Sequence, residues 1–203
     1  MSAALKRSLT PDEYLVIERA AKFKSEFYHG EMFAMAGPRY SHNRVLANLI
    51  FRISACLQGS ACFVLPNDMR VKSIRNNSYF YPDVIIVCGK PQFEDNVFDT
   101  LLNPKVIIEV LSESTERFDR GDKFEEYSNM SSLEEYVLVS QDRMQIQRFT
   151  RQAEDHWDMR IFKDESGEFS LQKVKVAIPM KDIYAGIEFG QGESHSVDLS
   201  IPR

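Results

Sequence analysis

Two short apolar segments, residues 84–88 and 106–111, constrain this chain more than any other feature, because the second has a carboxylate in its middle. Both segments are rich in valine and isoleucine and are bounded by turn residues, a pattern typical of buried strands. Glu109 is costly to bury in such a strand unless a cation or hydrogen-bond donors meet it. The sequence therefore predicts a sheet whose interior holds an acidic side chain together with its partners.

A second acid, Asp83, stands directly before the first of these strands, and Lys123 follows the second one. Because proline is disfavoured inside a sheet, Pro82 indicates a strand start or a bend, which would turn the Asp83 side chain toward a cleft. Two carboxylates and an ammonium group are the chemical types that hold a divalent cation and stabilise charge on a phosphate. The separation along the chain leaves open whether these side chains converge.

Composition sets limits on the kind of protein. The 203 residues suit one domain with appendages, and 43% hydrophobic residues suffice for a full core. The net charge of −5 and the pI of about 5.5 argue against an extended basic surface for nucleic acid. A small site in which metal ions meet a phosphate is compatible with these values.

Cysteine usage and hydropathy point to the cytoplasm. Cys56, Cys62 and Cys88 are odd in number and form no Cys-x-x-Cys pair, which predicts buried, reduced thiols. No apolar segment approaches the ~18 residues of a membrane-spanning helix. The N-terminal residues lack the apolar core of a signal peptide, so we expect a cytoplasmic protein without membrane association.

The N-terminal region predicts a helix followed by a hairpin. Residues 10–13 have the pattern of a capping box, and we expect this helix to end near Lys24, with Glu18 at the rim of its apolar face. Its buried positions are predicted to be Tyr14, Ile17 and Ala21. A tight turn at His29-Gly30 then joins two short strands within residues 26–35.

A second helix is predicted to begin with Ser41 as its cap and to end at Gly59. Its apolar residues recur at the helical period: Val45, Leu46, Leu49, Ile50, Ile53 and Leu57. His42 falls on the same stripe and so points toward the core. Two interpretations stay open for His42: a buried, hydrogen-bonded histidine, or a residue that orients a phosphate, a water or a metal-bound carboxylate.

The rest of the chain alternates strands with polar segments. Strands are predicted at residues 62–66, 68–74, 134–139, 144–149, 157–162 and 169–176, the last two paired with each other, and a short helix at 179–184. The acids of the loop 89–103 are interpreted as solvated surface. Asp119, Lys123 and Tyr127 are spaced by four and share one face of a helix, whose flanking strands suggest a right-handed crossover. The polar tail after Gly190 is expected to fray.

The joint pattern of these residues resembles the Uma family of predicted restriction endonucleases, within the PD-(D/E)XK nuclease superfamily. The resemblance covers roughly residues 8–190. Its most specific part consists of Pro82-Asp83, Glu109-Val110-Leu111-Ser112, Ser114-Thr115, Asp119, Lys123 and Tyr127. It implies an α/β (α+β) fold, a restriction-endonuclease-like mixed sheet flanked by helices with additional antiparallel hairpins. We expect residues 1–203 to form one such domain, with its core at about 8–190.

The resemblance also implies a catalytic site. Asp83 and Glu109 match the metal-binding acids of the superfamily, and the backbone carbonyl of Val110 would complete the ligand set for Mg²⁺, or for Mn²⁺. The superfamily's lysine usually stands where this chain has Leu111, and families of this type move it to the following helix, which fits Lys123. Lys72 and Lys105 are weaker candidates for that role.

Other residues are candidates for accessory roles. An acid from the N-terminal part often joins the site, and the sequence does not separate Glu26 from Glu31. His42 and Tyr127 are further accessory candidates, although Tyr127 fits a packing role better than a catalytic one. Ser112, Ser114 and Thr115 are expected to shape the turn after the Glu109 strand, and Asp68 and Arg70 could line the cleft.

The implied function is a Mg²⁺-dependent DNA endonuclease that hydrolyses phosphodiester bonds by means of a metal-activated water. Its expected partners are DNA and a second copy of the chain, because cleavage of both strands is simplest with two sites related by twofold symmetry. Two alternatives remain. One is a catalytically degraded nuclease-fold module that binds DNA or protein. The other is a metal phosphoesterase that acts on small substrates.

Overall fold

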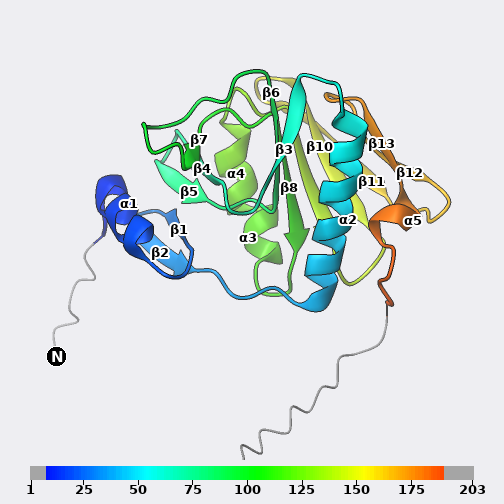
Figure 1. Ribbon diagram of the computed structural model, residues 1–203, viewed down its shortest axis with the longest axis horizontal. Helices are drawn as coiled ribbons and strands as arrows, with labels where there is room; N and C mark the ends of the chain where they lie inside the picture. The colour runs from blue at the N-terminus through cyan, green and yellow to red at the C-terminus, as the bar shows by residue number, and fades with distance from the viewer. Residues whose placement is uncertain (1–7, 190–203) are drawn as a thin grey trace, which may run out of the picture.

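A six-stranded mixed sheet forms the centre of the protein, which the computed structural model describes over residues 8–189 (Figure 1). Its strand order is β11 (His156–Phe162), β10 (Ile146–Ala153), β9 (Glu135–Ser140), β8 (Val106–Leu111), β6 (Val84–Cys88) and β3 (Cys62–Pro66). Strand β8 is parallel to β9 and antiparallel to β6. The two strands predicted around the acidic residues therefore lie side by side, as expected.

A second, five-stranded sheet lies toward the N-terminal end of the molecule. Its order is β2 (Glu31–Ala34), β1 (Ser25–Tyr28), β5 (Ser78–Phe80), β4 (Arg70–Ser73) and β7 (Thr100–Leu101). A separate hairpin consists of β12 (Glu168–Leu171) and β13 (Val176–Pro179). The predicted mixed α/β architecture is confirmed, with the strands divided between two mixed sheets.

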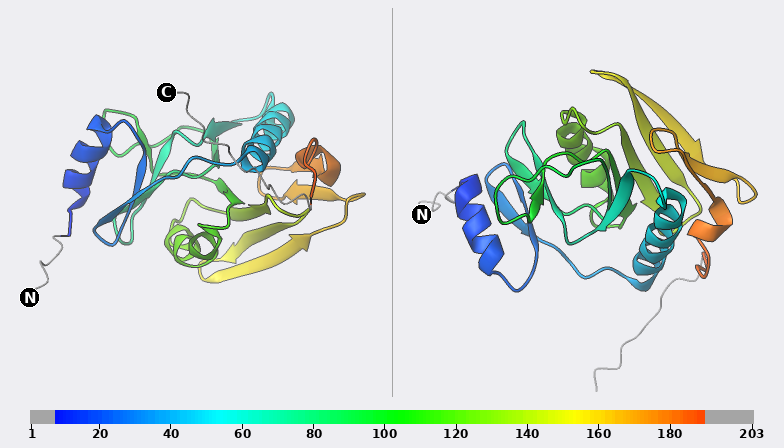
Figure 2. Two further views of the ribbon diagram at one scale, coloured as in Figure 1. Left: turned by 90° about the horizontal axis from the view of Figure 1, so that it is seen from below. Right: turned by 45° about the horizontal axis from the view of Figure 1, so that its top comes forward.

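Helices cover both faces of the central sheet, because successive side chains of a buried strand point to opposite faces. On one face, α2 (Tyr40–Leu57), α5 (Met180–Ile183) and the β12–β13 hairpin pack against residues such as Val84, Ile86 and Ile108. On the other face, α4 (Asp122–Ser128) packs against the alternate residues, including Ile85 and Ile107, after the short helix α3 (Glu116–Arg120). Figure 2 gives two further views of this layering.

The first helix, α1 (Pro11–Ala20), has the predicted capping box at Thr10 and Glu13. It ends at Ala20, earlier than the expected Lys24. Its packing also differs from the prediction, because its buried residues are Tyr14, Leu15 and Glu18, whereas Ile17 is exposed. Glu18 is buried since its carboxylate accepts hydrogen bonds from the Ser25 backbone and the Tyr81 hydroxyl.

The predicted hairpin after α1 is confirmed. Strands β1 and β2 pair antiparallel, and His29 and Gly30 both have positive φ, at 49° and 80°. In α2 the predicted apolar stripe is buried apart from the partly buried Ile50, but Ser41 is not its cap. The helix begins two residues earlier than a Ser41 cap would place it, with Arg39 at the N-cap, and the Ser41 hydroxyl donates to the side chain of Gln141 instead.

The acids of the loop 89–103 are not a solvated surface, contrary to the prediction. Asp99 pairs with Arg19 and with the buried Arg70, each at 2.8 Å, and Glu94 pairs with Lys72 at 2.6 Å. The hydrogen bond from Arg19, together with the charge of Arg70, lowers the pKa of Asp99 well below its usual range. These ion pairs tie the loop to α1 and to the five-stranded sheet.

The C-terminal strands pair differently from the prediction. Strand β11 extends the central sheet beside β10, while β12 pairs with β13 across a turn in which Lys175 has a φ of 57°. The residues between β11 and β12 connect the central sheet to the hairpin. The ring centroids of Phe162 and Phe169, at the two ends of this connection, are 5.4 Å apart. The short helix α5 is confirmed, and the predicted frayed tail lies outside the described residues.

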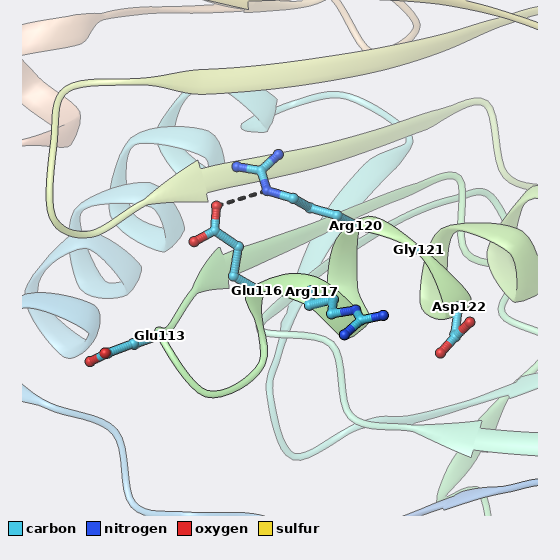
Figure 3. Close-up of a pocket in the computed structure, with 6 residues that line it drawn as sticks. All are labelled: Glu113, Glu116, Arg117, Arg120, Gly121 and Asp122. Carbon is cyan, nitrogen blue, oxygen red and sulfur yellow. Dashed lines mark hydrogen bonds and ion pairs between the residues drawn. The ribbon is translucent and has the colours of Figure 1, made fainter.

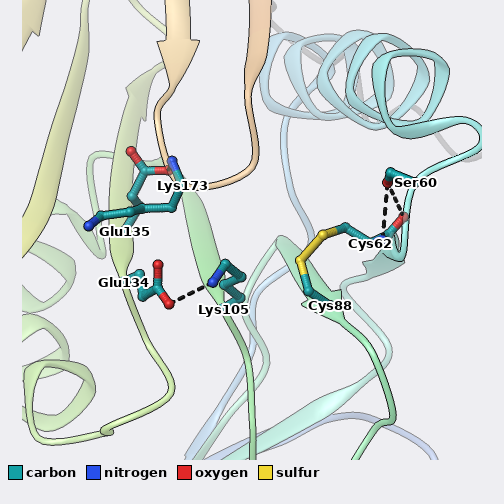
Figure 4. The surroundings of a disulfide bond; sticks show 7 residues. All are labelled: Ser60, Cys62, Cys88, Lys105, Glu134, Glu135 and Lys173. Atoms are coloured by element: carbon teal, nitrogen blue, oxygen red, sulfur yellow. Dashed lines mark hydrogen bonds and ion pairs between the residues drawn. A yellow bond between two sulfur atoms is a disulfide. The ribbon is translucent and has the colours of Figure 1, made fainter.

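The cysteines also overturn an expectation. Cys62 and Cys88 lie directly opposite each other in the antiparallel β3–β6 pair, with Cα atoms 3.9 Å apart, and they form a disulfide (Figure 4). Cys56 is free but exposed. Buried, reduced thiols are therefore the wrong prediction, because spacing along the chain does not reveal cross-strand partners. Between residues 8 and 189, no helix is long and apolar enough to cross a membrane.

Candidate active site

Glu109 points from β8 toward α4, because it lies on the same face of the sheet as Ile107 and Leu111, which are two residues away on either side. Only 3% of the residue is exposed. Its carboxylate accepts a hydrogen bond from the Tyr127 hydroxyl at 3.2 Å and lies 3.3 Å from the Lys123 ammonium. The acid that was predicted to need buried partners thus has a hydroxyl and a cation beside it.

Lys123 is the centre of a buried cluster of acids. Its ammonium lies 2.9 Å from Glu26, 3.2 Å from Asp119 and 3.3 Å from Glu109. Burial by itself would lower the pKa of Lys123, but the three carboxylates outweigh it and raise the pKa well above its ordinary value. Lys123 therefore stays charged across the physiological pH range.

The same surroundings favour the neutral form of Glu109, whereas they favour the charged form of Lys123. Burial raises the pKa of Glu109 well above its ordinary value, and the charges of Asp119, Asp83 and Glu26 add to this effect against the opposing charge of Lys123. Its carboxyl group is therefore held toward the protonated form while a single ammonium is the cation beside it. A further positive charge at this position would favour ionisation.

Asp83 joins this cluster from the start of β6. Its backbone N–H donates to Glu109 at 3.3 Å, and its Oδ2 accepts from the backbone N–H of Val110 at 2.8 Å. Nε2 of His42 lies 3.2 Å from the same Oδ2. Among residues 8–189, Asp83 Oδ1 makes no hydrogen bond, and 13% of the side chain is exposed. The carboxylate is therefore oriented through one oxygen while the other is open.

Val110 lies where the ladder between β6 and β8 has ended, because the last pair joins Val84 to Ile108. The N–H and C=O groups of one strand residue lie along the same edge of the strand. Since the Val110 N–H reaches Asp83, the Val110 carbonyl lies along the same edge, beyond the last paired residue of β6. This arrangement offers a carbonyl oxygen beside the two acids.

His42 lies in the first turn of α2 and is 8% exposed. Nε2 of this buried histidine contacts Asp83, as the first interpretation expected, and its role in orienting a metal-bound carboxylate stays a prediction. Its other ring nitrogen, Nδ1, is buried without a hydrogen-bond partner in the part of the chain that the structure describes. A donor or acceptor from water would complete this histidine.

The oxygen atoms around Asp83 and Glu109 form a small set of candidate metal ligands. Among the described residues, no group of three or more His, Cys, Asp or Glu side chains is arranged to hold a metal. Mg²⁺, however, typically takes one or two carboxylates and keeps several waters. The open oxygen of Asp83, the carboxylate of Glu109 and the carbonyl of Val110 fit that smaller requirement.

The structure separates the two N-terminal candidates. Glu26 on β1 reaches Lys123, and it also accepts a hydrogen bond from the Tyr81 backbone at 3.1 Å. Glu31 stands at the exposed start of β2, on the outermost strand of that sheet. Glu26 is therefore the acid that joins the cluster.

Other candidates lie in unrelated contacts. Lys72 pairs with Glu94, and Lys105 pairs with Glu134 at 2.6 Å near the other end of β8, as Figure 4 shows. Asp68 pairs with Lys24 and has an 82% exposed side chain. Arg70 belongs to the ion pairs that hold the loop 89–103. None of these side chains contacts the acids around Lys123 in the described structure.

Asp119 belongs to the cluster, although the sequence indicated it only as part of the family pattern and as a helix neighbour of Lys123, without a role in the site. Asp119 is 3% exposed and faces the ammonium four residues later in the chain. The expected single helix is interrupted at Gly121, which separates α3 from α4, yet Asp119 and Lys123 remain on one side. The spacing of four was the signal, because a charged pair on a buried helix face indicates a shared site.

The turn after β8 bears an open depression of about 620 Å³ beside the cluster's helices. Its lining residues are Glu113, Glu116, Arg117, Arg120, Gly121 and Asp122 (Figure 3). Arg120 is paired within the depression to Glu116 at 2.8 Å. The mixed charges and the absence of the buried acids from the lining distinguish this depression from the candidate site. Ser112 stands just before it and contacts the hydroxyls of Ser114 and Thr115, which shapes the turn as predicted.

The sequence matches the model of the family Uma2, described as "Putative restriction endonuclease", over residues 11–178. Two proteins of Synechocystis sp. are similar along most of their length. The uncharacterized protein sll1609 is 33% identical over 176 residues, which are 87% of this chain and 99% of that protein. The uncharacterized protein slr1290 is 29% identical over 181 residues, which are 89% of this chain and 94% of that protein.

A solved structure has the same fold. It is described as the crystal structure of a putative nuclease belonging to DUF820 from Anabaena variabilis. The superposition has a TM-score of 0.71 and covers 87% of this chain and 97% of the other, at 15% sequence identity. This likeness supports the two-sheet architecture described above.

Proposed function

The chain belongs to the Uma2 family, and from that membership together with the geometry around Lys123 we propose that it is a Mg²⁺-dependent or Mn²⁺-dependent DNA endonuclease. The observation that carries the proposal is the contact between Asp83 and Glu109 at the end of β8 that extends beyond its pairing with β6. The two acids come from adjacent strands, and the buried Lys123 reaches Glu109 from the following helix.

Asp83, Glu109 and the Val110 carbonyl would hold the divalent cation. When bound, such an ion supplies charge compensation for the phosphate and lowers the pKa of a coordinated water. His42 and the Val110 N–H hold Asp83 through Oδ2, so that its other oxygen would be free to ligate the cation. This orientation reduces the reorganisation that ligand binding would otherwise require.

Lys123 would stabilise the negative charge that develops on the phosphate during attack by water. In this hydrolysis a water oxygen forms a bond to phosphorus, the bond from phosphorus to one sugar oxygen breaks, and the departing oxygen takes up a proton. Glu26 and Asp119 keep the ammonium in place through the ion pairs already described. Tyr127 holds Glu109 from the side opposite Asp83, which is a positioning role.

The charge balance of the cluster favours a metal site over a purely structural ion pair. Three carboxyl groups, those of Glu26, Glu109 and Asp119, surround one ammonium, and Asp83 adds a fourth beside Glu109. Ionised carboxylates crowded at this density repel one another unless further positive charge is present. A divalent cation would supply that charge and at the same time create the reactive site.

The catalytically degraded module is the second candidate. It is favoured by the net charge of −5 and by the burial of Glu109 and Lys123. In that case the cluster would stabilise the fold and the protein would bind DNA or another protein without cutting.

A nicking assay separates these two functions. Purified protein is mixed with supercoiled plasmid and Mg²⁺ or Mn²⁺, in parallel with Asp83→Ala and Glu109→Ala. We expect nicking by the wild type, background levels with both variants, and unchanged activity with Glu165→Ala, an exposed control outside the site. Equal cleavage by wild type and both variants would indicate a contaminating nuclease. Binding of DNA by the wild type without any cleavage would support the degraded module.

A further inference from the structure

Strand β11 is an edge strand with an unusual surface. It pairs with β10 on one side, and no described strand pairs with its other side (Figure 2). It is seven residues long, and its Met159 and Ile161 are 51% and 42% exposed. A long edge strand with exposed apolar residues offers free backbone groups and a surface for pairing with another strand.

The two faces of β11 differ in chemistry. One face of β11 bears Trp157, Met159 and Ile161. Phe149 of β10 lies opposite Met159 and projects from the same face of the sheet. Asp158 and Arg160 alternate along the other face. An added strand must keep these faces in register, because directly opposed residues of an antiparallel pair project to the same side.

We infer that β11 binds the β11 strand of a second copy of this chain, antiparallel and with Met159 opposite Met159. In this register Asp158 of each copy lies opposite Arg160 of the other, so that two opposite-charge pairs form. Trp157 then lies opposite Ile161, and all seven residues of the strand are used. Cross-strand pairs of these kinds stabilise antiparallel sheets.

Neighbouring registers are disfavoured by charge. The nearest shifts that keep the apolar faces together move the strand by two residues, which places either Asp158 against Asp158 or Arg160 against Arg160. Like charges directly opposite each other destabilise a sheet. The pattern around Met159 is therefore self-complementary in one register only, and this selects a second copy of the chain as the occupant of the edge.

Arg160 lacks an acidic partner in the part of the chain that the structure describes. Its opposite residue on β10 is Arg148, a like charge, and Arg160 makes no ion pair with any residue between 8 and 189. Asp158 pairs with His156 at 3.2 Å, but both side chains are about two-thirds exposed, 65% and 66%. An acid from a second copy would offset the repulsion between the two arginines.

The inferred interface is independent of the proposed nuclease activity. Joining two six-stranded sheets through β11 would place seven strand spacings between the two copies of β8, on the order of 34 Å in a flat sheet. Every residue of the candidate site comes from one chain. Loss of the dimer should therefore leave each site complete.

Charge-reversal variants test the inference. Asp158→Arg places two arginines opposite each other across the interface, and Arg160→Asp places two aspartates opposite each other. Each variant alone should be a monomer, with a dimer dissociation constant at least about tenfold weaker than that of the wild type. An equimolar mixture should form a heterodimer, because the arginines of one variant then face the aspartates of the other.

The assay is sedimentation equilibrium over a range of concentrations, with circular dichroism to verify folding. The wild type should show twice the 23.5 kDa mass of one chain. Glu165→Arg, an exposed charge reversal outside the strand, should behave as the wild type. A wild type that stays monomeric overturns the inference. A dimer that persists in both variants, or a mixture that stays monomeric while the wild type dimerises, overturns it equally.

Discussion

Replacing Glu109 by glutamine should make the metal-free protein relatively more stable as the pH rises. The amide removes one of the four acidic groups but keeps the size of the side chain and an oxygen that can accept from the Tyr127 hydroxyl. The Lys123 ammonium retains its other two carboxylate partners, Glu26 and Asp119. The substitution therefore tests the charge of Glu109 separately from its packing.

The sign follows from burial, which raises the pKa of Glu109 well above its ordinary value. The unfolded chain releases this proton at a pH of about 4.3, whereas the folded chain keeps it to a higher pH. The resulting contribution to stability is fully present below the unfolded pKa and is lost as the pH rises toward the folded pKa. Each pH unit between the unfolded and the folded pKa costs the wild type about 1.4 kcal/mol of folding free energy.

The measurement is urea unfolding in EDTA at pH 5, 6 and 7. Glu113→Gln is the matched control, because its carboxylate lies in the turn that follows β8 and its side chain is 88% exposed. The stability of the wild type relative to Glu109→Gln should fall with each pH unit, while Glu113→Gln should follow the wild type. If Glu109→Gln is instead less stable by a constant margin at all three values, Glu109 is an ionised partner of Lys123 and the reasoning is wrong.

Three further predictions concern stability. Lys123→Met should lower the free energy of unfolding by about 3 to 5 kcal/mol, because it leaves buried acids without their cation, and urea unfolding would measure this. Cys62→Ser should cost about 3.5 kcal/mol under oxidising conditions, since the bond to Cys88 closes a loop of 26 residues; equal stability with and without reductant would contradict it. Gly30→Ala should cost more than about 1 kcal/mol in thermal unfolding, because Gly30 has a φ of 80° and a Cβ would lie 1.8 Å from Ser8 Oγ.

The strands that carry the site could be predicted from the sequence because they are buried on both faces. Such strands appear as continuous apolar runs, so residues 84–88 and 106–111 were found at their observed bounds. The capping box and the His29-Gly30 turn were equally visible, because each depends on neighbouring residues. Local chemistry of this kind is encoded within a few positions.

Long-range pairing could not be predicted in the same way. The disulfide between Cys62 and Cys88 depends on the register of β3 against β6, and the partner of β11 depends on which sheet it joins. Glu18 was predicted to lie at the rim of α1, but it is buried. Its hydrogen-bond partners, the Ser25 backbone and the Tyr81 hydroxyl, lie outside the helix, so the helical pattern does not reveal them. A one-dimensional pattern contains no information about such neighbours.

The candidate site was predictable in its residue types but not in its full membership. The spacing of Lys123 and Tyr127 predicted a common helix face, and both side chains do contact Glu109. The choice between Glu26 and Glu31 depended on which strand of the hairpin faces α4, and this is set by tertiary packing. Whether these residues act in catalysis stays a prediction.

Binding of a divalent cation at Asp83 is the central claim, and calorimetric titration of metal-free protein with Mn²⁺ tests it most directly. We predict one site per chain in the wild type and at least about tenfold weaker binding by Asp83→Asn. Asp68→Asn, which changes an 82% exposed carboxylate, should bind as the wild type does. Equal affinity of the wild type and Asp83→Asn, or no binding by the wild type at millimolar Mn²⁺, would contradict the account.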